Sequence, residues 1–327
     1  MPFLNRLVFC TVIILILTVI GGFLGIILGP SKLPLGDLLN TILLKSDSVN
    51  STIIWDIRIP RILIAFTVGS AFSISGVILQ TNTRNPLGDP QLFGITGGAL
   101  IVQALVLSGI LNNNPWFQTT LSVIASIISA ILIFTLANRS NVKPSTLALI
   151  GFSIGTMCIA ISTGIMAYYR VFTQQVLSVI GGSTSNIPWS SYFPILPFML
   201  LGLILIFSVS TKLNVIVLGD VISKNIGINS TRIKFISMVS AGILSGAAVS
   251  VVGTVGLLGL MAPHITRIIV GNNVRLILCF SIPIGGLLML YADQISRLAF
   301  MPNEVPVGFV ISALGAPLMV YLAWRYL

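Results

Sequence analysis

The most regular feature of the sequence is a succession of long stretches without a charged residue, separated by short polar segments. A helix needs roughly 20 apolar residues to cross the hydrocarbon core of a membrane, and most of these stretches reach that length. The pattern therefore predicts an all-α integral membrane protein with about ten transmembrane helices. We expect them near residues 7–29, 59–81, 92–110, 115–137, 145–168, 192–210, 234–252, 254–271, 274–299 and 305–324.

Some of the uncharged stretches are too long for one helix, and internal breaks decide how they divide. The run 90–138 contains Asn112-Asn113-Asn114-Pro115, and asparagine and proline favour turns. A second long run divides near Gly253. In the run 171–211, Gly181-Gly182 predicts the end of a short helix that does not cross the membrane, followed by one spanning helix.

Composition supports the membrane assignment. Hydrophobic residues make up 55% of the chain and charged residues 7%, whereas a soluble domain carries roughly 25% charged residues. So few charges exclude a soluble enzyme and a nucleic-acid-binding domain, and the high hydrophobicity excludes disorder. We expect one transmembrane domain over residues 1–327, in contact with lipid in a plasma or inner membrane and with no nucleic acid as partner.

The distribution of the basic residues predicts the orientation. Ten spans place both termini on one side, and basic residues concentrate on the cytoplasmic side of membrane proteins. With cytoplasmic termini, 11 of the 17 Lys and Arg residues lie in cytoplasmic segments: Arg6, Arg84, Arg139, Lys143, Lys212, Lys224, Arg232, Lys234, Arg267, Arg275 and Arg325. The other six are Lys32, Lys45, Arg58, Arg61, Arg170 and Arg297. The bias supports cytoplasmic termini, but three outer arginines, Arg58, Arg61 and Arg297, need another explanation.

A short similarity suggests an internal repeat. The segment from Ser70 to Gly76 matches the segment from Ser240 to Gly246 at four of its seven positions. The first lies in a span expected to run inward and the second in a span expected to run outward, as in an inverted-topology repeat. This predicts repeat halves at about 55–170 and 230–325. Small residues also occur wherever membrane helices pack closely, which is the simpler explanation of the match.

The sequence offers little for catalysis or metal binding. It contains no G-x-x-x-x-G-K-[ST] phosphate loop, and its one histidine, His264, has no obvious partner ligand. A packed, hydrogen-bonded histidine is the more typical role, with a haem or metal ligand as the alternative. We expect no catalytic residue, metal site or cofactor in this chain. Ion-coupled transporters place ionisable groups near the midplane, where this sequence has almost none, so a partner is expected to supply energy for transport.

A polar cytoplasmic stretch, residues 212–232, predicts a short helix between two spans. Asp220 and Lys224 have the spacing of a helical ion pair, and Gly219 and Gly227 bracket the segment, with Gly227 suited to end the helix. Apolar residues that include Leu218 could form one face of it. Such a helix either rests on the membrane surface or docks in the groove of a partner protein.

Several motifs, in order along the chain, resemble those of permease subunits of the ABC importers for iron–siderophores, haem and cobalamin, the FecCD type. In the first half they are Arg58-Ile59-Pro60-Arg61, Ser75-Gly76 with Gln80, and Arg84-Asn85-Pro86-Leu87-Gly88-Asp89-Pro90 with Gly94. In the second half they are Gly256-Leu257-Leu258-Gly259-Leu260-Met261-Ala262-Pro263-His264-Ile265-Thr266-Arg267, Ala292-Asp293 with Arg297, Glu304-Val305-Pro306-Val307-Gly308 and Gly315-Ala316-Pro317. The resemblance covers about 55–320. Gly88 replaces the family's usual alanine, and Leu257-Leu258 its usual Phe-Val.

The resemblance implies a type II ABC importer architecture. Two permease subunits, identical or different, would enclose the pathway, and two ATPase subunits would bind ATP and magnesium. An extracytoplasmic substrate-binding protein would deliver the cargo. An iron–siderophore is the expected cargo, with haem or cobalamin as the alternative and an ion-coupled secondary transporter as a more distant one.

The resemblance also implies roles for individual residues. Arg58, Arg61 and Arg297 would pair with acidic residues of the binding protein, since guanidinium groups stay charged and bind carboxylates bidentately. They could instead anchor helix ends at lipid headgroups or pair with Asp56 and Asp293. The segment 218–229 would correspond to the coupling helices that fit the ATPase groove, which favours partner docking.

The polar residues of the second span and of the loop after it are candidates for the pathway. Asn85 and Pro86 begin a loop whose two prolines and glycine cannot continue a helix, so it serves either as a structural turn or as a cytoplasmic gate. Ser73 and Gln80 are the candidate pathway-lining residues.

Overall fold

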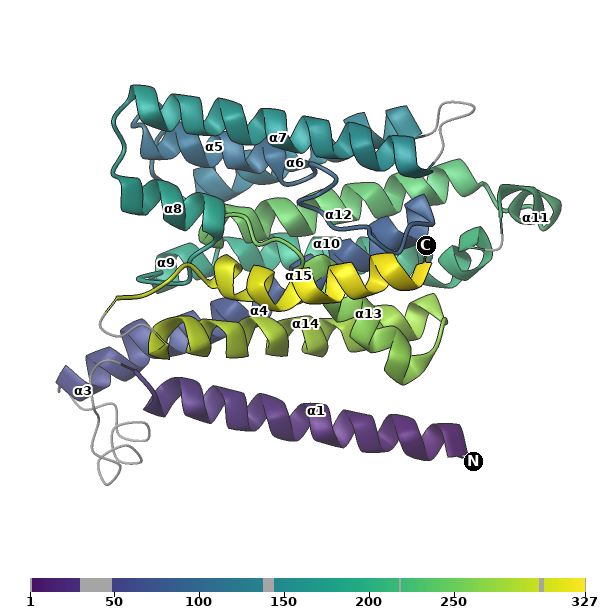
Figure 1. Ribbon diagram of the computed structural model, residues 1–327, viewed down its shortest axis with the longest axis horizontal. Coiled ribbons are helices and arrows are strands. Elements are labelled where there is room, and N and C mark those ends of the chain that lie inside the picture. Colours follow the sequence, from purple (N-terminus) through teal and green to yellow (C-terminus); the bar gives the residue numbers. More distant parts are fainter. Residues whose placement is uncertain (1, 30–48, 138–143, 218, 300–302, 327) are drawn as a thin grey trace.

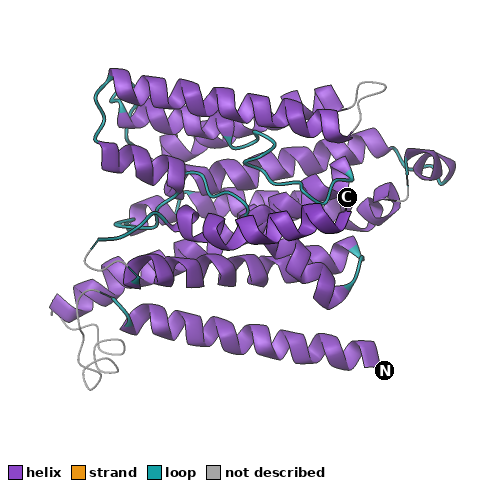
Figure 2. Ribbon diagram, in the orientation of Figure 1, coloured by secondary structure: helices purple, strands orange, loops and turns teal. Residues whose placement is uncertain are grey.

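The computed structural model describes residues 2–29, 49–137, 144–217, 219–299 and 303–326, and this part of the chain consists of helices and their connections (Figures 1 and 2). Ten helices correspond to the ten predicted spans, so the all-α prediction is confirmed. They are α1 (Pro2–Ile27), α4 (Ile59–Thr83), α5 (Gly97–Leu107), α6 (Pro115–Ala137), α7 (Pro144–Tyr168), α10 (Ile195–Val217), α12 (Ser230–Val252), α13 (Leu258–Val270), α14 (Val274–Leu298) and α15 (Val307–Tyr326).

Shorter helices connect the long ones. They are α3 (Val49–Thr52), the π-helix η1 (Ile53–Arg58), α8 (Thr173–Gly181), α9 (Trp189–Tyr192) and α11 (Asp220–Asn225). Helix α8 is the short helix predicted within 171–211, and Gly182 ends it with a positive φ of 69°. Helices α3 and η1 lead directly into α4, so the chain is helical from Val49 to Thr83.

Two of the predicted spans are shorter than expected. Helices α5 and α13 have 11 and 13 residues, and the predictions that began them at 92 and 254 were wrong at their first turns. The segment before α5 contains Pro90 and a glycine, Gly94, with a φ of 71°. The segment before α13 contains Gly253 and Leu257, with φ of 83° and 65°. Left-handed residues cannot belong to a right-handed helix, so both helices begin later.

The centre of the bundle depends on glycines that let helix backbones touch. A Cβ atom on Gly69 of α4 would lie 2.3 Å from the carbonyl oxygen of Gly285 in α14, and one on Gly76 would lie 1.8 Å from that of Gly259 in α13. No side chain fits at these distances. Close backbone approach at small residues is a main way in which membrane helices associate, since lipid provides no hydrophobic driving force between them.

The packing repeats itself between the two halves of the chain. Helix α12 lies along α6 as α4 lies along α14, and the short helices α5 and α13 occupy corresponding positions. Gly246 of α12 lies against α6, where an added Cβ would be 2.8 Å from the carbonyl oxygen of Ser122. Helices α4 and α12 run in opposite directions (Figure 1). These pairings have the form of an inverted repeat.

The outer helices face lipid. Helix α1 lies along one side of the bundle and exposes large apolar side chains such as Phe9, Leu15 and Val19. Seven helical stretches of the described residues are long and apolar enough to cross a membrane, and α5, α13 and α15 are shorter apolar helices. The chain is therefore a multi-pass membrane protein. Both termini lie at the same end of the bundle as α11, which we call the terminal end (Figure 1).

Candidate functional site

At the opposite end, a buried cluster of charges joins three parts of the chain. Arg61, in the first turn of α4, lies 2.9 Å through Nη2 from Oδ1 of Asp293 in α14. Its Nη1 donates at 3.0 Å to both carboxylate oxygens of Glu304, just before α15. The side chain of Asp293 is fully buried, that of Arg61 is 8% exposed and that of Glu304 is 27% exposed. One guanidinium group thus binds two carboxylates in the bidentate manner that arginine favours.

Two further arginines extend this cluster to α1. Arg297 Nε lies 3.4 Å from Oδ2 of Asp293, one helical turn away on α14. Arg58 Nη1 donates to the carbonyl oxygens of Ile26 and Ile27, the latter at 2.9 Å. These carbonyls belong to the end of α1, where the helix dipole favours positive charge. The charge cluster, defined as Arg58, Arg61, Arg297, Asp293 and Glu304, therefore contains three cations and two anions.

The segment after α8 is attached to the same carboxylates. The hydroxyl of Thr184 donates to Asp293 and that of Ser185 donates to Glu304. Backbone bonds hold the segment from the other side, because Ser183 N donates to Val252 O at 2.8 Å. The charge cluster thereby fixes the position of the connection between α8 and α9.

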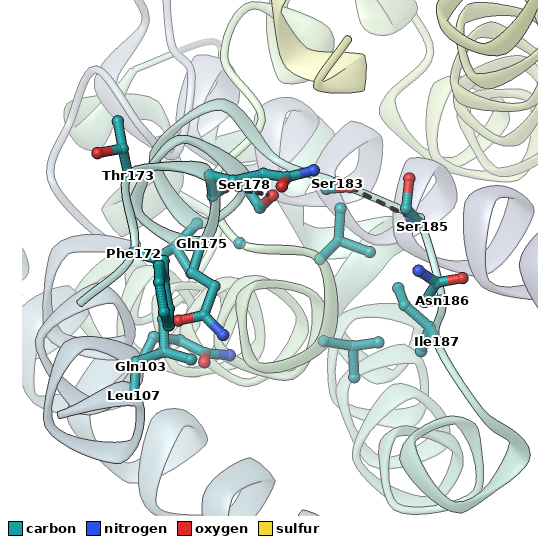
Figure 3. Close-up of a pocket in the computed structure, with 15 residues that line it drawn as sticks. Gln103, Leu107, Phe172, Thr173, Gln175, Ser178, Ser183, Ser185, Asn186 and Ile187 are labelled. Atoms are coloured by element: carbon teal, nitrogen blue, oxygen red, sulfur yellow. Dashed lines mark hydrogen bonds between the residues drawn. The ribbon is translucent and has the colours of Figure 1, made fainter. Parts of the chain in front are cut away.

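A cavity of about 870 Å³ lies beside this connection, among α5, α8 and the end of α12 (Figure 3). Its polar lining residues carry amides and hydroxyls: Gln103, Thr173, Gln174, Gln175, Ser178, Ser183, Ser185 and Asn186. The remaining lining residues are Leu107, Phe172, Val179, Ile187, Val251, Val252 and Gly253. Gln103 supports the wall, because its Nε2 donates to Val249 O at 2.9 Å and its Oε1 accepts from Gln118 at 2.8 Å.

The structure places the candidate docking residues inside the protein rather than on its surface. Arg58, Arg61 and Arg297 are 3%, 6% and 3% exposed, and each contacts other parts of the chain. The alternative pairing with Asp293 is present for Arg61 and Arg297, whereas Asp56 is exposed. Docking to a binding protein stays a prediction.

The loop after α4 is built as a defined turn. Arg84 ends α4 with a φ of 49°, and the side chain of Asn85 accepts from Leu87 N at 3.0 Å. Asp89 is fully buried and accepts from Gln91 N at 2.9 Å. Burial raises the pKa of Asp89 to about 6, and backbone hydrogen bonds from Leu92 and Gln91 act in the opposite direction. The arrangement accounts for a structural role of Asn85 and Pro86, and a gating role stays a prediction.

Ser73 and Gln80 are buried within the bundle. Gln80 Nε2 donates at 3.3 Å to Gly88 O and to Gly259 O, so it connects α4 to the loop and to α13. Ser73 lies against Gly285 of α14, where an added Cβ would be 2.3 Å from the Cβ of Ser73. Both side chains therefore serve helix packing, and their pathway-lining role stays a prediction.

Helix α11 stands out from the terminal end of the bundle (Figure 1). Gly219 and Gly227 bracket it with φ of 123° and 77°, as the sequence suggested, and an added Cβ would meet no atom at either position. Ile222 and Ile226, one turn apart, are 43% and 61% exposed. Leu218 lies outside the described residues, as do the side chains of Asp220 and Lys224. The helix thus presents an apolar face away from the bundle.

Sequence reasoning missed two parts of the site. It did not place Thr184, Ser185 and Glu304 with the arginines, although the chain has few acidic residues and Asp293 falls in the motif of Arg297. It also gave no role to Gln174 and Gln175 of α8. Two adjacent glutamines in a nearly uncharged chain are a signal that could have identified a polar surface. Among the described residues, no group of three His, Cys, Asp or Glu could hold a metal ion.

The structure is thus an all-helical membrane bundle with an inverted repeat, a polar cavity at the end away from the termini and a projecting helix at the terminal end. Residues 16–325 match the model of the FecCD transport family, and the chain belongs to this family.

Relatives and a solved structure define the class further. The chain is 32% identical over 314 residues to the Fe(3+)-citrate import system permease protein YfmD of Bacillus subtilis. This alignment covers 95% of this chain and 93% of the relative. It is 32% identical over 313 residues to a protein of Staphylococcus aureus named "Probable heme-iron transport system permease protein IsdF", covering 96% and 94%. A solved structure described as "An inward-facing conformation of a putative metal-chelate type ABC transporter" superposes with a TM-score of 0.80 at 25% identity, and the match covers 95% of this chain and 97% of that one. The chain is therefore a permease of a metal-chelate ABC importer with type II architecture.

We expect Asp293→Asn to destabilise the protein. The change removes the carboxylate shared by Arg61 and Arg297, so that Glu304 is the one carboxylate left in a cluster of three arginines, and breaking a buried ion pair typically costs about 3–5 kcal/mol. Thermal unfolding in detergent, followed by tryptophan fluorescence, measures the effect. Asp56→Asn is the matched control, because Asp56 is exposed and its loss should change stability by less than about 0.5 kcal/mol. Equal melting temperatures for the two variants would contradict the structural role of the cluster.

Proposed function

We propose that this permease carries a ferric siderophore into the cell. The observation that supports the cargo most directly is the cavity of about 870 Å³ lined by amides and hydroxyls. A cavity of this size suits a large organic ligand rather than a bare metal ion, which would need a compact set of ligands. Haem is the second candidate, because one of the relatives bears a name that refers to haem-iron transport.

The energy for transport comes from separate ATPase subunits in this proposal, and the permease acts together with a second permease subunit, identical or different. The terminal end of the bundle is the cytoplasmic end, in keeping with the excess of basic residues there. Helix α11 is the segment that enters the ATPase groove, because the exposed Ile222 of the helix and Ile226 directly after it offer an apolar face for a helix-in-groove contact.

Stimulation of ATPase activity by different cargoes tests the assignment of cargo. The permease, co-purified with its ATPase and supplied with its binding protein, is reconstituted in liposomes and its ATPase activity is measured. We expect a ferric siderophore to stimulate hydrolysis more strongly than haem or cobalamin does. Preferential stimulation by haem would support the second candidate, and stimulation by none of the three would reject the proposed cargo class.

The coupling role of α11 predicts a loss of communication without a loss of folding. Gly227→Leu forces a side chain onto a residue with a φ of 77°, which shifts the turn after α11. We expect the variant to insert in the membrane and to melt near the wild-type temperature, while cargo-stimulated ATPase activity falls at least about tenfold. Gly271→Leu is the matched control, since Gly271 also has a φ of 77° with open space around it but lies between α13 and α14. Equal ATPase stimulation in both variants would argue against coupling through α11.

The binding protein docks, in this proposal, through the charge cluster. Arg61 is already occupied, so an acidic residue of the binding protein would take the place of Glu304, the most exposed member of the Arg61 ion pairs. This exchange explains how a nearly buried arginine could bind a partner protein. Glu304 compensates the charge of Arg61 until the acidic residue of the binding protein replaces it.

This exchange predicts that removing the internal competitor strengthens docking. Glu304→Gln should raise the affinity for the binding protein by about threefold to tenfold at low salt, and the gain should shrink at high salt as charges are screened. Binding of labelled binding protein to the permease in nanodiscs measures the change. Asp56→Asn removes an exposed negative charge elsewhere and should have a smaller effect. An affinity unchanged by Glu304→Gln would show that Arg61 is not a docking residue.

A further inference from the structure

The chemical lining of the outer cavity limits the charge of the cargo. None of its fifteen lining residues has an ionisable side chain. The amides of Gln174, Gln175 and Asn186 form no side-chain hydrogen bond within the described part of the chain, so their donors and acceptors are available to a ligand. Phe172, which is 79% exposed, adds an aromatic surface to the same cavity. Figure 3 shows Gln175 and Asn186 on different walls of it.

The location of the cavity connects it with transport. It lies at the end of the bundle away from both termini, beside the segment that the charge cluster holds through Ser185. Polar side chains at membrane depth face the protein interior or water rather than hydrocarbon, so this lining borders an aqueous space. A cargo that arrives from the outer side meets these groups early in its passage.

The arginines of the charge cluster are not among the residues that line this cavity. Arg61 directs its guanidinium group to Asp293 and Glu304, and Ser185, which lines the cavity, lies against Glu304 rather than against an arginine. An anion that enters an uncharged site loses hydration without gaining a counter-ion, which is unfavourable. A neutral ligand rich in oxygen loses less, because amides and hydroxyls can replace its hydrogen bonds to water.

We propose that this cavity selects ferric chelates without net charge, of which a ferric trihydroxamate is the model, over anionic chelates such as ferric citrate. Gln174, Gln175 and Asn186 supply the hydrogen bonds to the ligand oxygens, and Phe172 packs against its carbon chain. The inference rests on the proposed function, and it divides the possible cargoes by charge.

Uptake of radiolabelled iron by the reconstituted importer, with its ATPase and binding protein, tests the inference. A ferric trihydroxamate, ferric citrate and an anionic ferric tris-catecholate are compared at equal concentration. We expect uptake of the neutral chelate to exceed that of either anionic chelate by about tenfold or more, equivalent to ~1.4 kcal/mol of discrimination. Higher uptake of an anionic chelate would overturn the inference while leaving chelate import intact. Uptake of none would reject the proposed function itself.

Variants of the permease separate the contribution of the cavity to selectivity from that of the binding protein. The same binding protein is used with every variant. Gln175→Lys should shift the ratio of anionic to neutral uptake upward severalfold, and Gln175→Glu should shift it downward. Asn113→Lys adds the same charge at an exposed position outside the lining and should leave the ratio unchanged. Gln175→Met, which adds no charge, should reduce neutral uptake through the lost hydrogen bonds. A ratio that responds to neither charge variant, or equally to Asn113→Lys, would overturn the role of the cavity.

Discussion

The burial of opposite charges at one end of the bundle is the constraint on which the architecture of that end depends. Taking ions out of water is costly, and removing either partner of such a pair leaves an uncompensated charge. Arg61 therefore requires Asp293 and Glu304 to be present together, which brings the start of α4, the end of α14 and the start of α15 to one point. Through the hydroxyls of Thr184 and Ser185 the same carboxylates also determine where the wall of the cavity stands. Five of the few charged residues of this chain therefore lie together, and their contacts position the helices and the connection beside the cavity.

The interior of the bundle depends instead on glycines, which have no side chain and let helix backbones touch. Gly69 and Gly76 allow α4 to touch α14 and α13 with its backbone, and Gly246 allows α12 to touch α6. These contacts hold α4 and α12 at the centre of the bundle, while α1 and α7 lie at the edge with largely exposed surfaces. Motion during transport is then easier to accommodate at the periphery and in the connections than between the central helices.

The sequence predicted the helices well and the site only in part. Long uncharged runs identify spanning helices because the hydrocarbon core demands them, and ten of ten have a counterpart in the structure. The late start of α13 was not predicted, since Leu257 adopts a φ of 65° that its residue type does not announce. The pairing of charges in the cluster could not be predicted from neighbouring residues in the sequence either. Arg61 and Glu304 are 243 residues apart, so their pairing follows from the packing of three helices rather than from any spacing along the chain.

The two short helices have a consequence for electrical insulation. At 1.5 Å per residue, α5 and α13 extend about 16 and 20 Å, less than the roughly 30 Å of the hydrocarbon core. Helix α5 lacks its turns on the side of the termini, where 84–96 is irregular, and α13 lacks them on the opposite side, where 253–257 is irregular. Each irregular segment therefore lies in one half of the membrane, and the regular helix of the same element crosses the other half. Water that reaches one of these segments therefore meets hydrogen-bonded helical backbone in the other half of the membrane, which opposes the passage of ions to the far side.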